Sequence, residues 1–114
     1  MTLLEASNLE INIGERQLIR DLNVEIGSGE SWALLGCNGA GKTTLLHTLA
    51  HLRPHHQGVI KIRGKNIKSL KRRELAQRIG LLFQEGLSMM PSTVMEMVIL
   101  GRYPHQKSLL WDDF

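Results

Sequence analysis

The chain has 114 residues, which is the size of one domain. It is 42% hydrophobic and 22% charged, a balance typical of soluble globular proteins, and no run approaches the roughly 18 apolar residues of a membrane span. A net charge of +3 without a nucleic-acid-binding motif, together with 4% aromatic residues, leads us to expect no nucleic-acid partner. The single cysteine, Cys37, excludes an internal disulfide and is typical of a reducing compartment.

Two short segments near the N-terminus alternate apolar and polar residues. Residues 9–13 read Leu-Glu-Ile-Asn-Ile, and residues 22–26 read Leu-Asn-Val-Glu-Ile. A period of two predicts strands with one buried face and one wet face. Gly14-Glu15 predicts a turn after the first of them. We therefore expect an antiparallel ribbon at the edge of the fold.

The pattern changes at residues 32–35, which read Trp-Ala-Leu-Leu without a polar interruption. Such a run predicts a strand that is buried on both faces. A glycine-rich turn follows it, and leucines then recur at helical spacing at positions 45, 46, 49 and 52. Arg53-Pro54 predicts the end of this helix. The glycine-rich turn is thus expected between a buried strand and a helix.

Four further elements are predicted along the rest of the chain. Residues 58–63 favour a strand, residues 70–79 a charged helix, and residues 80–83 a short buried strand. A last helix is expected to begin after Thr93, because Thr93 and Glu96 have the spacing of a capping box. The basic residues concentrated between positions 61 and 78 are interpreted as a solvated surface rather than a contact for nucleic acid or membrane headgroups.

The glycine-rich turn matches the pattern Gly-x4-Gly-Lys-Ser/Thr of a phosphate-binding loop. Backbone N–H groups must converge on phosphate oxygens there, and a Cβ would block the approach, which explains the glycines. The helix that follows directs the positive end of its dipole at the anion, Lys42 supplies a cation, and Thr43 offers a hydroxyl to Mg²⁺. The candidate nucleotide-binding residues are Gly36, Cys37, Asn38, Gly39, Ala40, Gly41, Lys42, Thr43 and Thr44.

Two alternatives stay open at this loop. A glycine-rich turn can also bind nothing. Within the loop, Cys37 is either a reactive thiol near a helix N-terminus or a small side chain that fills space, and we favour the second interpretation.

The surroundings of the loop resemble the ATP-binding subunit of an ABC transporter. The matching stretches are Gly29-Glu30, Leu34-Leu35-Gly36, Asn38-Gly39-Ala40-Gly41-Lys42-Thr43-Thr44-Leu45-Leu46, Pro54 to Gly58, Gly64-Lys65-Asn66-Ile67 and Leu81-Leu82-Phe83-Gln84. The segment from Thr93 to His105 is similar to that of importers of iron chelates, haem and cobalamin. The resemblance covers nearly the whole chain, in order and without gaps.

This resemblance implies an α/β fold: a P-loop NTPase core with an antiparallel β edge and the start of a helical subdomain, truncated. Residues 1–114 would be the N-terminal part of a single ABC-type nucleotide-binding domain. The implied cofactors are ATP and Mg²⁺, with Thr43 and Gln84 at the metal and Gln84 also catalytic, beside the attacking water. The implied partners are transmembrane permease subunits and a second copy of the subunit in a homodimer. The implied location is cytoplasmic, peripheral on the inner face of the cell membrane through the permease.

The implied function is to couple ATP binding and hydrolysis to import of an iron chelate, haem or cobalamin. The family's signature motif, metal carboxylate, catalytic glutamate and switch histidine are not recognised in these residues, so we expect negligible hydrolysis by this chain alone. A truncated, non-catalytic nucleotide-binding module or an inactive remnant is therefore an alternative, and another P-loop enzyme such as a small kinase is a weaker one. Ile13 stands where the family places an aromatic residue against adenine, which leaves base selectivity open.

His47 and His51 are four residues apart on the predicted helix, which is the spacing of a metal-binding pair. No third ligand is implied by the sequence. We favour solvent-facing helix positions for both.

Overall fold

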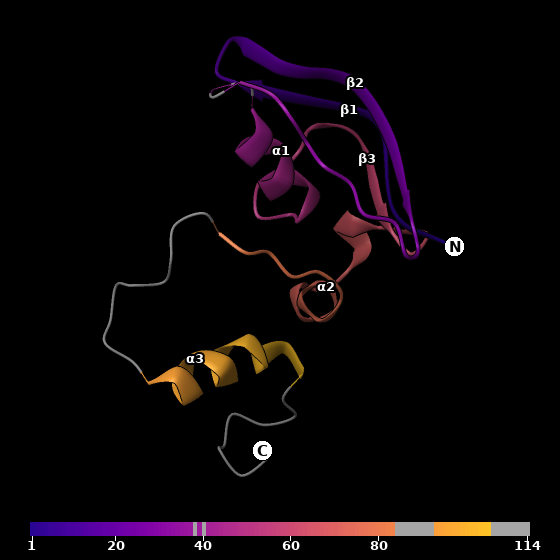
Figure 1. Ribbon diagram of the computed structural model, residues 1–114. Helices are drawn as coiled ribbons and strands as arrows, with labels where there is room; N and C mark the ends of the chain where they lie inside the picture. The colour runs from indigo at the N-terminus through magenta and orange to yellow at the C-terminus, as the bar shows by residue number, and fades with distance from the viewer. Residues whose placement is uncertain (38, 40, 84–92, 106–114) are drawn as a thin grey trace. The chain divides into compact units, whose positions relative to one another are not determined.

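The computed structural model describes residues 1–37, 39, 41–83 and 93–105, and the chain divides into two compact units, Met1–Leu70 and Lys71–Phe114. The described elements of the first unit are the strands β1 (Thr2–Ile13), β2 (Arg16–Gly27), β3 (Gln57–Ile62) and β4 (Lys65–Asn66), the helix α1 (Lys42–Leu49) and the 3₁₀ helix η1 (Ile67–Ser69) (Figure 1). Those of the second are α2 (Arg72–Arg78), α3 (Val94–Gly101) and the 3₁₀ helix η2 (Tyr103–His105).

A four-stranded antiparallel sheet in the order β2-β1-β3-β4 organises the first unit. The predicted antiparallel ribbon is confirmed by the pairing of β1 with β2, and both strands extend beyond the alternating segments. The predicted turn is confirmed at Gly14-Glu15, where Gly14 has a φ of 59°. The strand predicted at residues 58–63 corresponds to β3, which pairs with the other edge of β1.

Bulges bend the ribbon of β1 and β2. Asn8 and Asp21 have φ values of 51° and 49°, and the register of the pair shifts between Ala6 and Leu9. Asn23 stabilises both irregular positions: its Oδ1 accepts the N–H of Asn8 at 2.9 Å, and its Nδ2 donates to the carbonyl of Asp21 at 3.1 Å. The extra residue lets Ala6 and Leu9, three positions apart, both be buried.

Gly58 marks the closest approach between β3 and β1. It has a φ of 91°, and a Cβ at this position would lie 2.6 Å from both the carbonyl oxygen of Asn8 and the Cα of Leu9. Both atoms belong to the backbone and cannot yield as a flexible side chain would. Only glycine therefore fits where β3 passes the Asn8 bulge.

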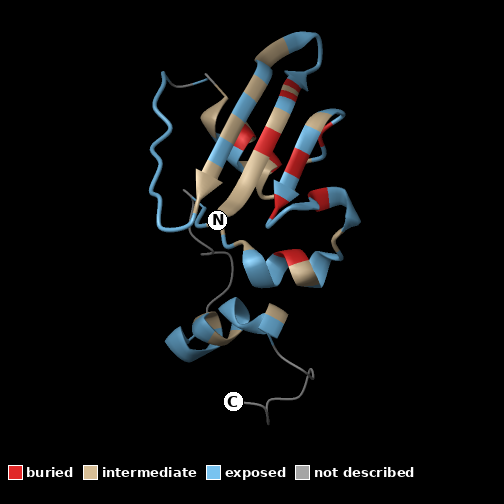
Figure 2. Cartoon of the chain, turned by 90° about the vertical axis from the view of Figure 1, so that its right-hand side faces the viewer, coloured by how far each residue is buried: buried red, intermediate tan, exposed pale blue. Residues whose placement is uncertain are grey.

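The core of the first unit lies between the sheet and the segments on one side of it (Figures 1 and 2). Its buried apolar side chains come from β1, β3, α1 and η1, namely Ala6, Leu9, Ile11, Ile60, Ile62, Leu45 and Ile67. Thr48 is also buried, and its hydroxyl donates to the carbonyl of Thr44 at 2.7 Å, so this polar group in the core is satisfied.

Helix α1 begins at Lys42, as the sequence predicts, but it ends at Leu49 instead of continuing to position 52. The chain reverses at His51, whose φ is 59°, and the N–H groups of Leu52 and Arg53 both donate to the carbonyl of His47. His51 therefore lies outside the helix and is half-buried. The interpretation of His47 and His51 as solvent-facing positions of one helix is wrong, because the helix ends at Leu49, before His51.

The strands predicted at residues 32–35 and 80–83 are wrong. The structure gives both segments an irregular backbone, and Trp32, Leu35 and Leu82 are 59%, 89% and 96% exposed. A strand buried on both faces needs a neighbouring strand on each side and a layer above and below. The described sheet runs through neither segment, so each apolar run lacks the pairing that would make it a strand.

The second unit contains short helices. Helix α2 lies within the predicted span of 70–79 and buries Leu75, and the amide Nε2 of Gln77 donates to the carbonyl of Pro104 in η2 at 2.6 Å. Helix α3 begins after Thr93, whose Oγ1 accepts the N–H of Glu96 at 3.1 Å, which confirms the predicted cap. No described helix is long and apolar enough to cross a membrane.

Replacement of Gly58 by alanine should destabilise the first unit by roughly 2–4 kcal/mol, because the new Cβ would meet backbone and φ would be strained. Gly64 is the matched control, since its φ is 81° but nothing lies within 4 Å of a Cβ there. Gly64→Ala should cost only about 1–2 kcal/mol. Urea unfolding of the two variants measures the difference, and equal losses would contradict the close approach at Gly58.

Candidate functional site

The described part of the phosphate loop has the backbone that its glycines predict. Gly39 and Gly41 have φ values of 83° and 95°, in the left-handed region that favours glycine. Gly36 and Cys37 are exposed and irregular in backbone. Asn38 and Ala40 lie outside the described residues. The loop thus exposes its backbone where it joins α1.

Among the described residues, no side-chain cap hydrogen bond is made at the N-terminus of α1. Gly41 is the N-cap residue, and no acidic residue lies in the first turn. The first intrahelical bond runs from the N–H of Leu45 to the carbonyl of Gly41 at 2.8 Å. The preceding N–H groups, combined with the helix dipole, make this end of α1 attractive to an anion.

Lys42 and Thr43 are adjacent at this helix end. The ammonium of Lys42 donates to the carbonyl of Gly36, so it closes the loop from its last residues to its first. Thr43 is exposed and Thr44 is half-buried. An ammonium and a hydroxyl at the open end of a helix can together receive phosphate oxygens and a magnesium ion.

Leu18 of β2 lies against the end of the loop. A Cβ on Gly41 would meet Leu18 Cδ1 at 3.3 Å and Leu18 Cβ at 3.4 Å. The side chain of Leu18 therefore lies beside Gly41, the N-cap residue of α1. Nothing in the sequence pattern singled out Leu18.

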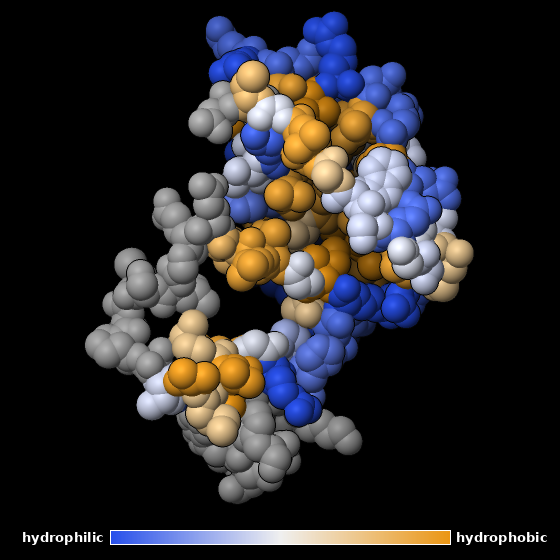
Figure 3. Space-filling view, in the orientation of Figure 1, coloured by the Kyte–Doolittle hydropathy of each residue, from blue (hydrophilic) through white to orange (hydrophobic). Residues whose placement is uncertain are grey.

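The segment that leads into the loop is exposed and apolar. Trp32 Nε1 donates to Glu30 Oε2 at 2.7 Å, and this hydrogen bond, with a second from the backbone of Gly27, lowers the pKa of the Glu30 carboxyl. Apolar side chains lie at the surface of this unit, as Figure 3 shows. Large apolar residues that are at least 45% exposed occur in this segment, on α1 and just after α1, and include Trp32, Leu34, Leu35, Leu46 and Leu52.

Other predicted site features rest on sequence alone. Gln84 lies outside the described residues, so its assignment to the metal and to catalysis stays a prediction. Among the described residues, no group of three or more histidine, cysteine or acidic side chains could hold a metal ion. Cys37 is a free, exposed thiol.

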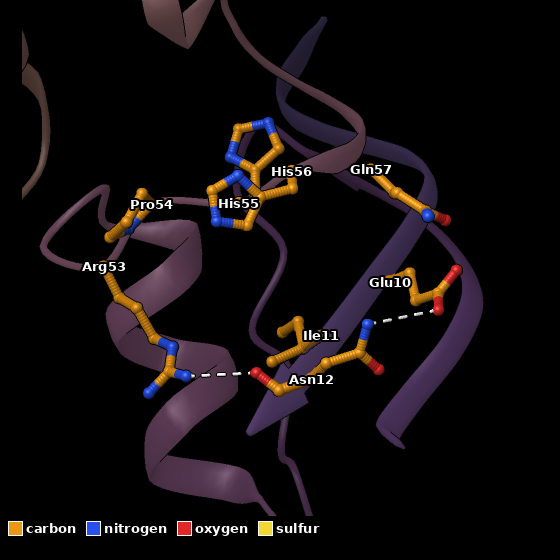
Figure 4. A pocket seen from close by; sticks show the side chains of 8 residues that line it. All are labelled: Glu10, Ile11, Asn12, Arg53, Pro54, His55, His56 and Gln57. Atoms are coloured by element: carbon orange, nitrogen blue, oxygen red, sulfur yellow. Dashed lines mark hydrogen bonds between the residues drawn. The ribbon is translucent and has the colours of Figure 1, made fainter. Parts of the chain in front are cut away.

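A pocket of about 220 Å³ lies between the end of β1 and the segment after α1 (Figure 4). Arg53 spans it, with Nη2 donating to the carbonyl of Asn12 at 3.2 Å. His55 lines it and is only 4% exposed. The sequence analysis missed both residues, because no spacing rule distinguishes a buried histidine or a bridging arginine in a turn.

The fold and the loop can be compared with known proteins. A solved nucleotide-free ATP-binding cassette from an ABC transporter shares the fold, with a TM-score of 0.61 over 68% of this chain and 30% of that chain, at 23% identity. The sequence profile described as "ABC transporter" matches residues 19–111. The chain belongs to the ABC transporter family. The predicted family resemblance and the predicted α/β fold class are thereby confirmed.

Three relatives within the ABC transporter family carry names that specify import or transport. The ferric enterobactin transport ATP-binding protein FepC of Escherichia coli is 40% identical over 90% of this chain and 38% of its own length. The iron(3+)-hydroxamate import ATP-binding protein FhuC of Bacillus subtilis is 35% identical over 93% of this chain and 39% of its own. The hemin import ATP-binding protein HmuV of Streptomyces coelicolor is 38% identical over 90% of this chain and 36% of its own.

These relatives place the chain within its family. The predicted resemblance to importers of iron chelates and haem is confirmed. The chain spans less than two-fifths of the length of these three proteins.

Because Leu18 lies beside Gly41, we expect substitutions at these two positions to have non-additive effects on the free energy of unfolding. Gly39→Ala and Gly41→Ala should each cost about 1–2 kcal/mol through the positive φ, and Gly41→Ala should cost more because its Cβ also meets Leu18. The extra cost should disappear in a Leu18→Ala background, with a coupling near 0.5 kcal/mol or above. Urea unfolding of the single and double variants measures it, and additive losses would count against the contact.

Proposed function

We propose that residues 1–114 are the N-terminal part of a single ABC-type nucleotide-binding domain and that its loop binds ATP with Mg²⁺. The observation that carries this proposal is the open N-terminus of α1, which has no cap, no acidic first turn and Lys42 beside it. An uncapped helix end costs stability unless something else satisfies its N–H groups. The phosphates of a nucleotide satisfy them and neutralise the adjacent ammonium.

Each residue of the loop has its own role in this proposal. Gly36, Gly39 and Gly41 let the backbone approach the phosphates, while Lys42 leaves the carbonyl of Gly36 for the β- and γ-phosphates. Thr43 contributes its hydroxyl to Mg²⁺. Gln84 would join the metal and orient the attacking water. Fixed donors and charges of this kind stabilise the charge that develops on a transferred phosphoryl group.

We further propose that the whole protein is an ATPase that drives import of an iron chelate, haem or cobalamin. The names of the relatives support iron chelates and haem as substrates and import as the process. Permease subunits in the membrane are the proposed partners, because the imported substrate needs a path across the membrane. The domain would act as a homodimer on the cytoplasmic face of the cell membrane, held there by the permease. At the end of β1, Ile13 would present an aliphatic surface to the base, since it is 45% exposed.

Binding of Mg-ATP by the chain should depend on Lys42. We expect Lys42→Ala to weaken the affinity by about 10- to 100-fold, which corresponds to the loss of one or two charge-assisted hydrogen bonds. Lys61→Ala is the matched control, because Lys61 is an exposed lysine on β3 and should leave affinity unchanged. Equilibrium titration with a fluorescent ATP analogue in the presence of Mg²⁺ measures the affinities.

Two outcomes of this titration bear on the alternatives. Equal affinities for the Lys42 and Lys61 variants would refute the phosphate loop as the binding site. Binding to the wild-type chain without hydrolysis is the expected result, because the chain lacks a recognised metal carboxylate and catalytic base.

A further inference from the structure

His55 is buried without a partner for one of its ring nitrogens. It is 4% exposed, and its Nδ1 makes no hydrogen bond. The Nδ1 of His51 is also buried without a hydrogen bond, and the rings of His51 and His55 meet edge to face with centroids 6.3 Å apart. An unsatisfied buried polar atom costs stability, and a buried charge without a partner costs far more. The site therefore accepts a neutral imidazole and resists an imidazolium.

The charged groups around His55 reinforce this preference. Burial is the largest cause that lowers the pKa of His55, followed by repulsion from Lys68 of η1 and from His51 and His56 of its own segment. Arg53 adds another cation to the pocket that His55 lines. Glu10 of β1 is the acidic residue in that lining, and its Oε1 already accepts from Asn12 Nδ2 at 3.3 Å and from Gln17 Nε2. No described carboxylate is thus paired with His55.

The residues around His55 also hold the C-terminal end of α1. We call residues 50–57 the latch segment. Its N–H groups at Ala50, Leu52 and Arg53 donate to the carbonyls of Leu46 and His47, which are the last turn of the helix. At the other side, Arg53 bonds the carbonyl of Asn12 in β1 (Figure 4). The latch segment therefore joins α1 to the sheet, with His55 as its buried anchor.

We propose that the latch segment is a pH-sensitive device: it holds α1 against β1 while His55 is neutral, and it opens when His55 gains a proton. Opening would free the last turn of α1 and, since the phosphate loop begins the same helix, weaken the binding of phosphates at its N-terminus. This second consequence rests on the proposed function, whereas the opening itself does not.

The direction of the pH effect follows from the lowered pKa. A histidine in the open segment takes up a proton near its ordinary pKa of about 6.5, and the closed segment takes it up only at lower pH. The open form therefore binds more protons between these two values, and the closed form loses stability as pH falls below about 6.5. Above that pH the latch is closed and its stability is constant.

The first experiment is amide hydrogen exchange of the full chain at pH 7.5 and 5.5, corrected for the intrinsic pH dependence of exchange. We expect protection of the N–H groups at positions 50, 52 and 53 to fall severalfold at pH 5.5, because the open segment takes up a proton that the closed segment resists. In His55→Gln, which has no titrating ring, protection should be the same at both pH values. His56→Gln is the matched control: it removes an exposed neighbouring histidine whose repulsion is the smallest of the named causes, and it should keep most of the wild-type pH dependence.

The second experiment measures affinity for Mg-ATP and for inorganic triphosphate at the same two pH values. The phosphates titrate identically with every variant, so a steeper loss in wild type than in His55→Gln isolates the latch. Identical pH profiles for these two proteins in exchange and in affinity would overturn the proposal. Exchange that responds to pH in a chain that binds neither ligand would refute the proposed function and retain the latch.

If His55→Gln does not fold, an NMR titration of the wild-type imidazoles tests whether His55 stays neutral in the closed latch segment. We expect the signal of His55 to remain that of a neutral ring at a lower pH than an ordinary histidine does. Ordinary titration of all five histidines near pH 6.5 would overturn the proposal.

Discussion

The close passage of β3 over the Asn8 bulge of β1 is the constraint on which the first unit depends. Because Gly58 has no Cβ, β3 can pair with the free edge of β1 instead of adding to β2. The chain must then leave the end of β2 at Gly27 and return to the opposite edge of β1 at Gln57. The phosphate loop, α1 and the latch segment all lie in this crossing. The pairing of β3 with β1 at Gly58 therefore determines where the connection from β2 to β3 ends. Within this connection, α1 lies beside Leu18 of β2 at its start, and the hydrogen bond from Arg53 to Asn12 joins the segment after α1 to β1.

A helix held at both ends can present its dipole in a fixed direction. At the N-terminus of α1 the N–H groups of the first turn, the glycine backbone and the Lys42 ammonium are already close together, so a phosphate would find its donors in place. The ammonium meanwhile rests on the carbonyl of Gly36, which spares it an unpaired state but offers a weaker partner than a phosphate. The energetic asymmetry between these two partners is what would make the loop a binding site and not merely a turn.

Sequence patterns predicted correctly those elements that are stabilised by nearby residues or by one neighbouring strand. The alternation at residues 9–13 and 22–26 was sufficient for strands that pair across an antiparallel sheet, and the Thr93 cap followed from spacing alone. The runs at 32–35 and 80–83 were wrong because a doubly buried strand is decided by its neighbours, and a run of apolar letters does not say whether neighbours exist. The bulge at Asn8, the contact at Leu18 and the burial of His55 arise from tertiary packing, which no period in the sequence encodes. The glycine backbone of the loop, with positive φ at Gly39 and Gly41, fits the spacing of a phosphate-loop pattern, which is visible in the sequence itself.

As a residue that only fills space in the core, His55 would lower the stability of the fold compared with an apolar side chain. A leucine of similar volume would fill the same position without leaving a buried nitrogen unsatisfied and without any penalty at low pH. A histidine that only filled space would be expected to pair its Nδ1 or to face a carboxylate, and His55 does neither among the described residues. The position of His55 also matters for α1, because the latch segment that contains His55 makes the hydrogen bonds to the last turn of this helix. In the proposed latch, a proton taken up at His55 acts on the last turn of α1 through the hydrogen bonds of residues 50, 52 and 53, and the eight residues of α1 connect that turn to the loop at its other end.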